Sequence, residues 1–131
     1  MKSYLLFSSI IILFLTSCDP LQTIEFENKS DHLTTAKFFF QGKIASKFYG
    51  FQNNDSLTIV LEPEEKKVFN FGIGSWEINN TFDTLVSKIK KIEIINEYST
   101  KSYSNKYQIT NFLEKHILDN RYRARIIITF E

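Results

Sequence analysis

The sequence predicts a mainly β protein, a small antiparallel β-sandwich with one short helix. Several short segments alternate apolar and polar residues with a period of two, which is typical of strands that bury one face. Clusters of Asn, Asp, Ser, Gly and Pro separate these segments and favour turns. Because the helical crossovers of a parallel sheet are missing, short strands joined by turns favour a sandwich over a parallel α/β sheet.

Five segments carry the alternation, and each is expected to be a strand: TIEFEN from Thr23, SLTIVLEP from Ser56, KKVFNFG from Lys66, KIKKIEIIN from Lys88 and YRARIIITFE from Tyr122. In the first, Ile24 and Phe26 share one face, and Thr23 and Glu25 share the other. The last is the most regular, with Tyr122, Ala124, Ile126, Ile128 and Phe130 on one face and Arg123, Arg125 and Thr129 on the other.

One helix is expected at about residues 111–118. In TNFLEKHILDN, Phe112, Leu113, His116 and Ile117 have helical spacing. Asn111 with Glu114 three residues on resembles an N-terminal capping pair. We expect this helix to pack across one end of the sheets.

Residues 1–17 are expected to be a targeting segment. Met1-Lys2 supplies a positive start, and the run from Leu5 to Leu15 is apolar except for two serines. A membrane-spanning helix needs roughly 18 or more apolar residues, so the run favours a secretory signal over an anchor. Cleavage by an ordinary signal peptidase before Cys18 would require a small residue in place of Leu15.

Leu15-Thr16-Ser17-Cys18 resembles the lipobox of bacterial lipoproteins, in which Leu and two small residues precede a cysteine. The resemblance implies that Cys18 receives a diacylglyceryl group, that residues 1–17 are removed, and that the new amino terminus is acylated as well. Two or more acyl chains give stable membrane anchoring, whereas one chain is marginal. Acylation also removes a lone thiol, which would invite intermolecular disulfides in an oxidising compartment.

The predicted mature chain is one domain: residues 18–22 form the lipidated N-terminus and a short tether, and residues 23–131 form the sandwich. The chain has 16 Lys and Arg and 15 Asp and Glu, so the loss of Lys2 leaves the charges balanced. This balance argues against nucleic acid and against a polybasic membrane surface. With no thiol left, disulfides and cysteine metal sites are excluded.

A second resemblance covers most of the mature chain. FENKSD, LEPEEKKVFNF, a later tryptophan, IKKIEI and YQITNFLEK before a last strand resemble small uncharacterised envelope lipoproteins with immunoglobulin-like sandwiches. The resemblance implies a fold and a cell envelope location, and no activity.

Catalytic and metal chemistry have weak signals. The chain has two histidines, His32 and His116, and lacks HExxH, GxSxG and a Gly-rich phosphate loop. His116 with Asp119 would be a base and its orienting acid, but a partly exposed helix histidine is the favoured interpretation. Glu62, Glu64, Glu65 and Asp55 lack calcium-loop spacing and are interpreted as solvated turn residues. We expect no catalytic residue, no metal and no cofactor.

Partner-binding candidates are aromatic and basic residues: Tyr49 and Phe51 near a polar loop, Trp76, and Arg123 and Arg125 on the last strand. The favoured alternatives are a Phe-rich core, Trp76 buried in it, and arginines that protect an edge strand. Asp55-Ser56-Leu57 and Asp83-Thr84-Leu85 resemble acceptors of periplasmic O-glycosylation, which makes Ser56 and Thr84 candidate modification sites.

These observations favour a lipid-anchored protein of the bacterial cell envelope, on the inner or outer membrane, that acts as a non-catalytic binding or structural component. Its expected partners are the membrane, through the lipid, and an envelope protein or glycan. An inhibitor or immunity-type lipoprotein, using loops such as 48–56 or 72–82 against a toxin or hydrolase, is the alternative. A small hydrolase centred on His116 is the least favoured.

Overall fold

The computed structural model describes residues 19–41, 55–77, 81–118 and 123–131. These residues form two sheets and two short helices, α2 (Thr81–Lys88) and α3 (Lys106–Glu114). The first sheet has three strands in the order β4 (Lys66–Ile73), β1 (Leu21–Asn28) and β7 (Arg125–Phe130). The second has four in the order β3 (Ser56–Leu61), β2 (Thr34–Phe40), β5 (Ile89–Ile95) and β6 (Thr100–Tyr103). The predicted fold class, a small mainly β sandwich, is confirmed.

Strand pairing is antiparallel throughout the four-stranded sheet and between β1 and β4. The pair β1 and β7 is parallel, with Ile24 opposite Ile126 and Asn28 opposite Phe130. A parallel neighbour requires a long connection. The chain between β1 and β7, which contains β2 to β6, α2 and α3, supplies that connection.

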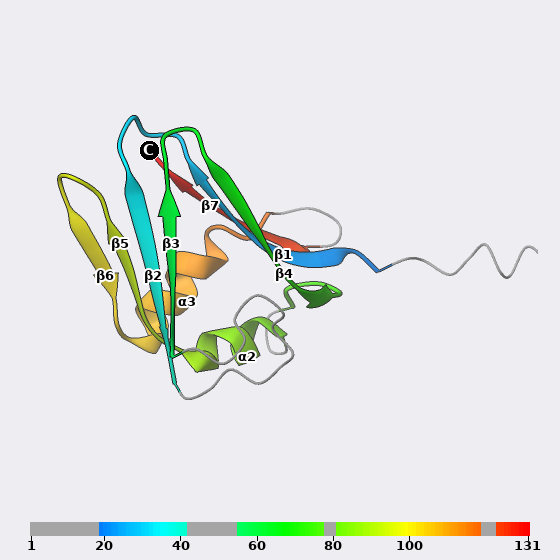
Figure 1. Cartoon of the computed structure of the whole chain (residues 1–131). Coiled ribbons are helices and arrows are strands. Elements are labelled where there is room, and N and C mark those ends of the chain that lie inside the picture. The colour runs from blue at the N-terminus through cyan, green and yellow to red at the C-terminus, as the bar shows by residue number, and fades with distance from the viewer. Residues whose placement is uncertain (1–18, 42–54, 78–80, 119–122) are drawn as a thin grey trace, which may run out of the picture.

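The two sheets meet near the turns that join β1 to β2 and β3 to β4, and they diverge toward the opposite end (Figure 1). Helices α2 and α3 fill the space between the diverging ends (Figure 1). The core is aromatic and aliphatic and is drawn from both sheets and both helices, and its most deeply buried residues include Phe26, Leu61, Trp76, Phe82, Ile92, Leu113 and Ile126.

Strand β1 departs from the predicted one-sided burial. Ile24 and Phe26 are buried as expected, but Thr23 and Glu25 on the other face are buried too. The reason is the place of β1 in the centre of its sheet, where long side chains from β4 and β7 cover its outer face. The first strand also begins at Leu21, two residues before the predicted start.

Helix α3 begins earlier than the predicted range of 111–118, and the predicted cap at Asn111 is wrong. Asn105 is the N-cap, and its side chain accepts a hydrogen bond from the backbone N–H of Gln108. Ile109, Phe112 and Leu113 then form the buried face. The helix ends at Glu114 because the chain next turns to join the edge of β7, where Ile117 pairs with Ile126.

Helix α2 and strands β2 and β6 were not among the expected elements. In α2, Phe82, Leu85 and Val86 are buried at helical spacing, but the segment is only two turns long. So short a pattern is a weak signal in sequence. Strand β6, TKSY, has no fully buried residue and is held by its pairing with β5.

Candidate functional site

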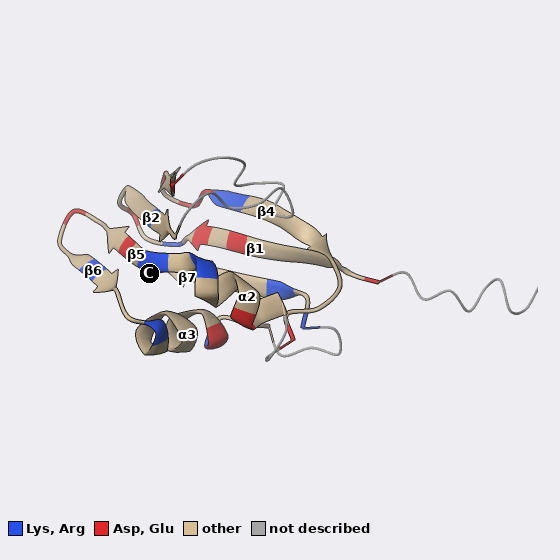
Figure 2. Cartoon of the chain, turned by 90° about the horizontal axis from the view of Figure 1, so that it is seen from below, with Lys and Arg blue, Asp and Glu red and all other residues tan. Residues whose placement is uncertain are grey.

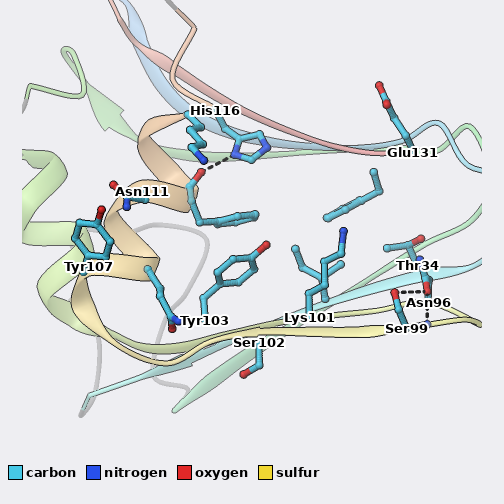
Figure 3. A pocket seen from close by; sticks show the side chains of 15 residues that line it. Thr34, Asn96, Ser99, Lys101, Ser102, Tyr103, Tyr107, Asn111, His116 and Glu131 are labelled. Carbon is cyan, nitrogen blue, oxygen red and sulfur yellow. Dashed lines mark hydrogen bonds between the residues drawn. The ribbon is translucent and has the colours of Figure 1, made fainter.

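The sandwich is open on the side where β6 and β7 form the edges of their sheets. The four-residue turn between β3 and β4 closes the opposite side. Helix α3 packs between β6 and β7 and closes part of the open side. The remaining gap is a pocket of about 500 Å³ (Figure 3). Its lining comes from the start of β2, the β5–β6 hairpin, α3 and the end of β7, and includes Thr34, Ile94, Asn96, Lys101, Tyr103, Asn111, Phe112, Lys115, His116, Phe130 and Glu131.

The end of the pocket beside Asn96 and Glu131 contains a buried hydroxyl group, that of Thr34 (Figure 3). Thr34 is 1% exposed, and its Oγ1 is the single buried side-chain polar atom without a hydrogen-bond partner among the described residues. Buried polar atoms are almost always paired because an unpaired one costs about 1–3 kcal/mol. Thr34 therefore stands out among the pocket residues as the one whose buried hydroxyl has unused hydrogen-bonding capacity.

Two side chains of β6 point into the pocket. Lys101 and Tyr103 lie on the inner face of β6, whereas Ser102 between them points away (Figure 3). The Tyr103 ring packs on Phe112 of α3 at a centroid distance of 4.5 Å, and Phe112 packs on His116 at 4.8 Å. The pocket therefore combines a wall of stacked rings with polar groups at both ends.

His116 lies at the wall of the pocket, one turn beyond Phe112. Its Nδ1 is 2.6 Å from the carbonyl oxygen of Phe112, and a carbonyl can only accept, so Nδ1 carries the proton. Asp119, its predicted orienting acid, lies outside the described residues, and Nδ1 already has a different partner. His32 lies in the β1–β2 turn instead, with Nε2 2.9 Å from Asp31 and Nδ1 3.3 Å from Glu97.

Trp76, the candidate for an exposed recognition residue, is fully buried, so it does not have that role. Its indole N–H donates to the carbonyl of Thr23 at 3.1 Å, and its ring packs edge-on against Phe71. The alternative interpretation, a tryptophan in the core, is the correct one. Burial follows from position: Trp76 enters the gap between the diverging sheets, where a large side chain is needed.

Arg125 is also unavailable to a partner, because it forms a bidentate pair with the buried Glu25. Its Nε lies 2.6 Å from Oε1 and its Nη2 2.8 Å from Oε2 of that carboxylate. Lys66 reaches the same carboxylate from β4, at 2.7 Å. Figure 2 shows the acidic positions of β1 flanked by basic ones on β4 and β7.

Arg123 lies before β7, not on it as predicted. Its φ of 44° is in the left-handed region, its side chain is exposed, and its carbonyl accepts from the backbone N–H of Trp76 at 2.8 Å. The predicted row of arginines on one strand face therefore does not form among the described residues, because Arg125 turns to Glu25 and Arg123 belongs to the preceding loop.

The hydrogen bonds from Arg125, together with that from Lys66, lower the pKa of Glu25 from its ordinary 4.5 to about 2, against the opposing effect of burial. A depressed pKa stabilises the folded state above pH 4.5, and this stabilisation is lost as the pH falls toward 2. We expect the native protein's advantage in free energy of unfolding over Glu25→Gln to be constant above about pH 5. It should shrink by about 3 kcal/mol near pH 2. Denaturant titrations of both proteins at several pH values measure this difference in free energy of unfolding. A difference that does not change with pH would contradict the ion-pair assignment.

The two candidate modification sites lie at the surface. Ser56 is exposed at the start of β3, and Thr84 is exposed on α2. The remaining predicted residues, Cys18, Tyr49 and Phe51, lie outside the described residues.

The loop after β4 is held against the domain through residue 77. The backbone N–H of Gly74 donates to the carbonyl of Pro20, and the carbonyl of Ser75 accepts from the side chains of Gln22 and Thr81. Of the two loops considered for an inhibitor, residues 48–54 and 78–80 lie outside the described part.

Sequence reasoning missed the residues that build the pocket. Thr34, Lys101, Tyr103 and Phe130 are spread over three strands, and no local pattern links them. The one signal in the sequence was the aromatic content, which predicted stacking surfaces without placing them. Only His116 of the pocket had been singled out.

No helix of the described residues is both long and apolar enough to cross a membrane. Within the same residues, no group of three or more His, Cys, Asp and Glu is placed to hold a metal ion. Comparisons with known proteins add no relative: no family model, no curated protein and no solved structure matches the chain.

Proposed function

We propose that this chain is a lipoprotein of the bacterial cell envelope, anchored through Cys18, whose sandwich domain is a non-catalytic module that binds glycan in the pocket between β6, α3 and β7. The lipobox at residues 15–18 supports the anchor. One observation carries the binding role: Thr34, whose buried hydroxyl has no hydrogen-bond partner in the fold, lines a pocket of about 500 Å³. That volume lies within the ordinary range of ligand sites.

The chemistry of the lining favours a glycan. Sugar rings present hydroxyl groups at their edges and an apolar face, which match polar side chains and aromatic rings respectively. The pocket offers hydroxyl and amide groups, such as Thr34 and Asn111, beside the rings of Tyr103 and Phe112. Its charged side chains, Lys101, Lys115 and Glu131, lie at exposed positions.

Thr34→Val tests the pocket. Since the hydroxyl has no protein partner, we expect the free energy of unfolding to stay unchanged or to rise by up to about 1 kcal/mol. We expect the dissociation constant for glycan to rise about tenfold, because one ligand hydrogen bond is lost. Calorimetry or NMR titration of the native and variant proteins, with N-acetylglucosamine oligosaccharides and with neutral glucose oligosaccharides, measures this dissociation constant.

Thr58→Val on β3 is the matched control, because Thr58 is an exposed strand residue away from the pocket. It should leave glycan affinity unchanged. If neither oligosaccharide series binds, the glycan role is wrong; if both variants bind as the native protein does, the assignment of the glycan to this pocket is wrong. Recovery of an envelope protein crosslinked through the pocket, with no glycan bound, would assign the site to a protein partner.

Cys18→Ser tests the anchor. We expect this variant to leave the membrane fraction and to lose metabolic labelling by a palmitate analogue, because the thiol is the acceptor of the lipid. Fractionation and labelling of cells that express the native and variant chains measure both. Asp19→Asn, next to the cysteine, is the control and should stay labelled. Retention of Cys18→Ser in the membrane would contradict the proposal.

A further inference from the structure

Two exposed aliphatic side chains lie side by side at the end of the sandwich where the described chain begins. Leu21 of β1 is 61% exposed and Ile73 of β4 is 71% exposed. They are direct partners across the β1–β4 ladder. Directly opposed side chains on one sheet lie within contact range, so the two form one small apolar surface.

The chain that leads to this surface is already fixed to the domain. The carbonyl of Pro20 accepts a hydrogen bond from the backbone N–H of Gly74 at 2.9 Å. Only Asp19 stands between Pro20 and Cys18. Three residue steps span at most roughly 11 Å, so a lipid on Cys18 holds Leu21 within about that distance of the acyl chains' attachment point.

We propose that Leu21 and Ile73 form a membrane-contacting surface, which lies in the interface of the lipid bilayer when Cys18 is acylated. This inference rests on the proposed lipid anchor. The short, fixed tether brings the apolar pair to the bilayer, and insertion removes both side chains from water. The chain neighbours of the pair are Pro20, Gln22, Gly72 and Gly74, none of them basic, so the attraction is apolar and does not require anionic lipid.

The orientation follows from the same contacts. Strand β1 runs from Leu21 at the membrane end to Asn28, a length of roughly 23 Å at 3.3 Å per residue. Asn28 pairs with Phe130, which lines the pocket. The chain enters the sandwich at the end opposite the C-terminus (Figure 1). The pocket is therefore held away from the bilayer and is accessible from the aqueous side.

A single-label experiment tests the surface in the full lipidated protein. Because Cys18 is the only cysteine and its sulfur carries the diacylglyceryl group, an introduced cysteine can be labelled alone with a nitroxide. Ile73→Cys reports on the membrane end, and Tyr98→Cys in the β5–β6 hairpin reports on the far end. Ile73 and Tyr98 are 71% and 73% exposed, which makes them a matched pair.

In phosphatidylcholine vesicles, we expect the label at position 73 to collide with oxygen several-fold more often, relative to a water-soluble nickel complex, than the label at position 98. Adding Leu21→Ser should shift the label at position 73 toward aqueous values. Equal, aqueous accessibility at both positions would overturn the membrane surface while the protein still floats with the vesicles. A chain that does not float, and whose Cys18 itself takes up label, would instead overturn the lipid anchor.

Discussion

Trp76→Ala is expected to lower the free energy of unfolding by about 4 kcal/mol, the usual cost of truncating a fully buried aromatic residue. The substitution removes the ring that packs against Phe71 and leaves the carbonyl of Thr23 without the indole N–H. Trp76→Phe should cost less, about 1–2 kcal/mol, because most of the ring packing remains while the hydrogen bond is lost. Urea denaturation followed by circular dichroism measures both.

Tyr98→Ala is the control, since Tyr98 is aromatic but 73% exposed, and we expect a loss below about 1 kcal/mol. A Trp76→Ala protein that keeps native stability would contradict the core assignment. If it lost partner binding at the same time, the recognition role that was first considered for Trp76 would be restored.

Asn28→Asp is expected to lower the free energy of unfolding by about 3–4 kcal/mol, nearly as much as Trp76→Ala, although it only replaces a side-chain amide by a carboxylate. Asn28 is fully buried. Its Nδ2 lies 2.7 Å from the carbonyl of His32 and 3.1 Å from those of Leu61 and Glu62, and its Oδ1 accepts from Ser30. A carboxylate would place a second acceptor against three carbonyl oxygens, which leaves them unpaired.

The position of Asn28 explains why so much depends on it: it joins the β1–β2 turn to the β3–β4 turn, where the two sheets meet. Asn96→Asp is the matched control. The Oδ1 of Asn96 accepts from Tyr98 and Ser99 within the β5–β6 hairpin, and a carboxylate retains those acceptors, so the loss should be below about 1 kcal/mol. Equal losses at the two positions, measured by denaturation, would contradict the role of Asn28 as a link between the sheets.

At Thr34, the stability of the fold conflicts with the proposed binding role. A valine there would remove an unpaired buried polar atom, yet the chain has a threonine. Proteins keep such local costs where a ligand needs the group. Thr34 therefore differs from Trp76 and Asn28, whose buried polar atoms are hydrogen-bonded within the fold.

Most strands could be predicted because their signal is local. Alternation in KKVFNFG and YRARIIITFE marked β4 and β7, and turn residues such as Pro63 marked the connections. Helix α3 was found but misplaced, since Asn105 and Asn111 are both acceptable caps and only packing against the sheets chooses between them. Helix α2 was missed because two turns of helix carry too little pattern.

The candidate partner-binding residues were predicted poorly, because exposure is not a local property. Trp76 and Arg125 have the residue types of recognition sites, but each finds its partner far along the chain. Trp76 reaches Thr23 and Arg125 reaches Glu25, one hundred residues away. The outer face of β1 could be recognised as buried only once β4 and β7 were known to flank it.

By itself, the sequence determined the class of fold, most of the strands and the expectation of a lipid on Cys18, since alternation, turn chemistry and a lipobox are all patterns of adjacent residues. The tertiary structure decided which polar groups are satisfied and which remain open. It paired Arg125 with Glu25, buried Trp76 and left Thr34 unpaired beside a pocket. It also placed Leu21 beside Ile73 at one end of the first sheet. These outcomes depend on contacts between segments distant in sequence, which form only when the sheets assemble.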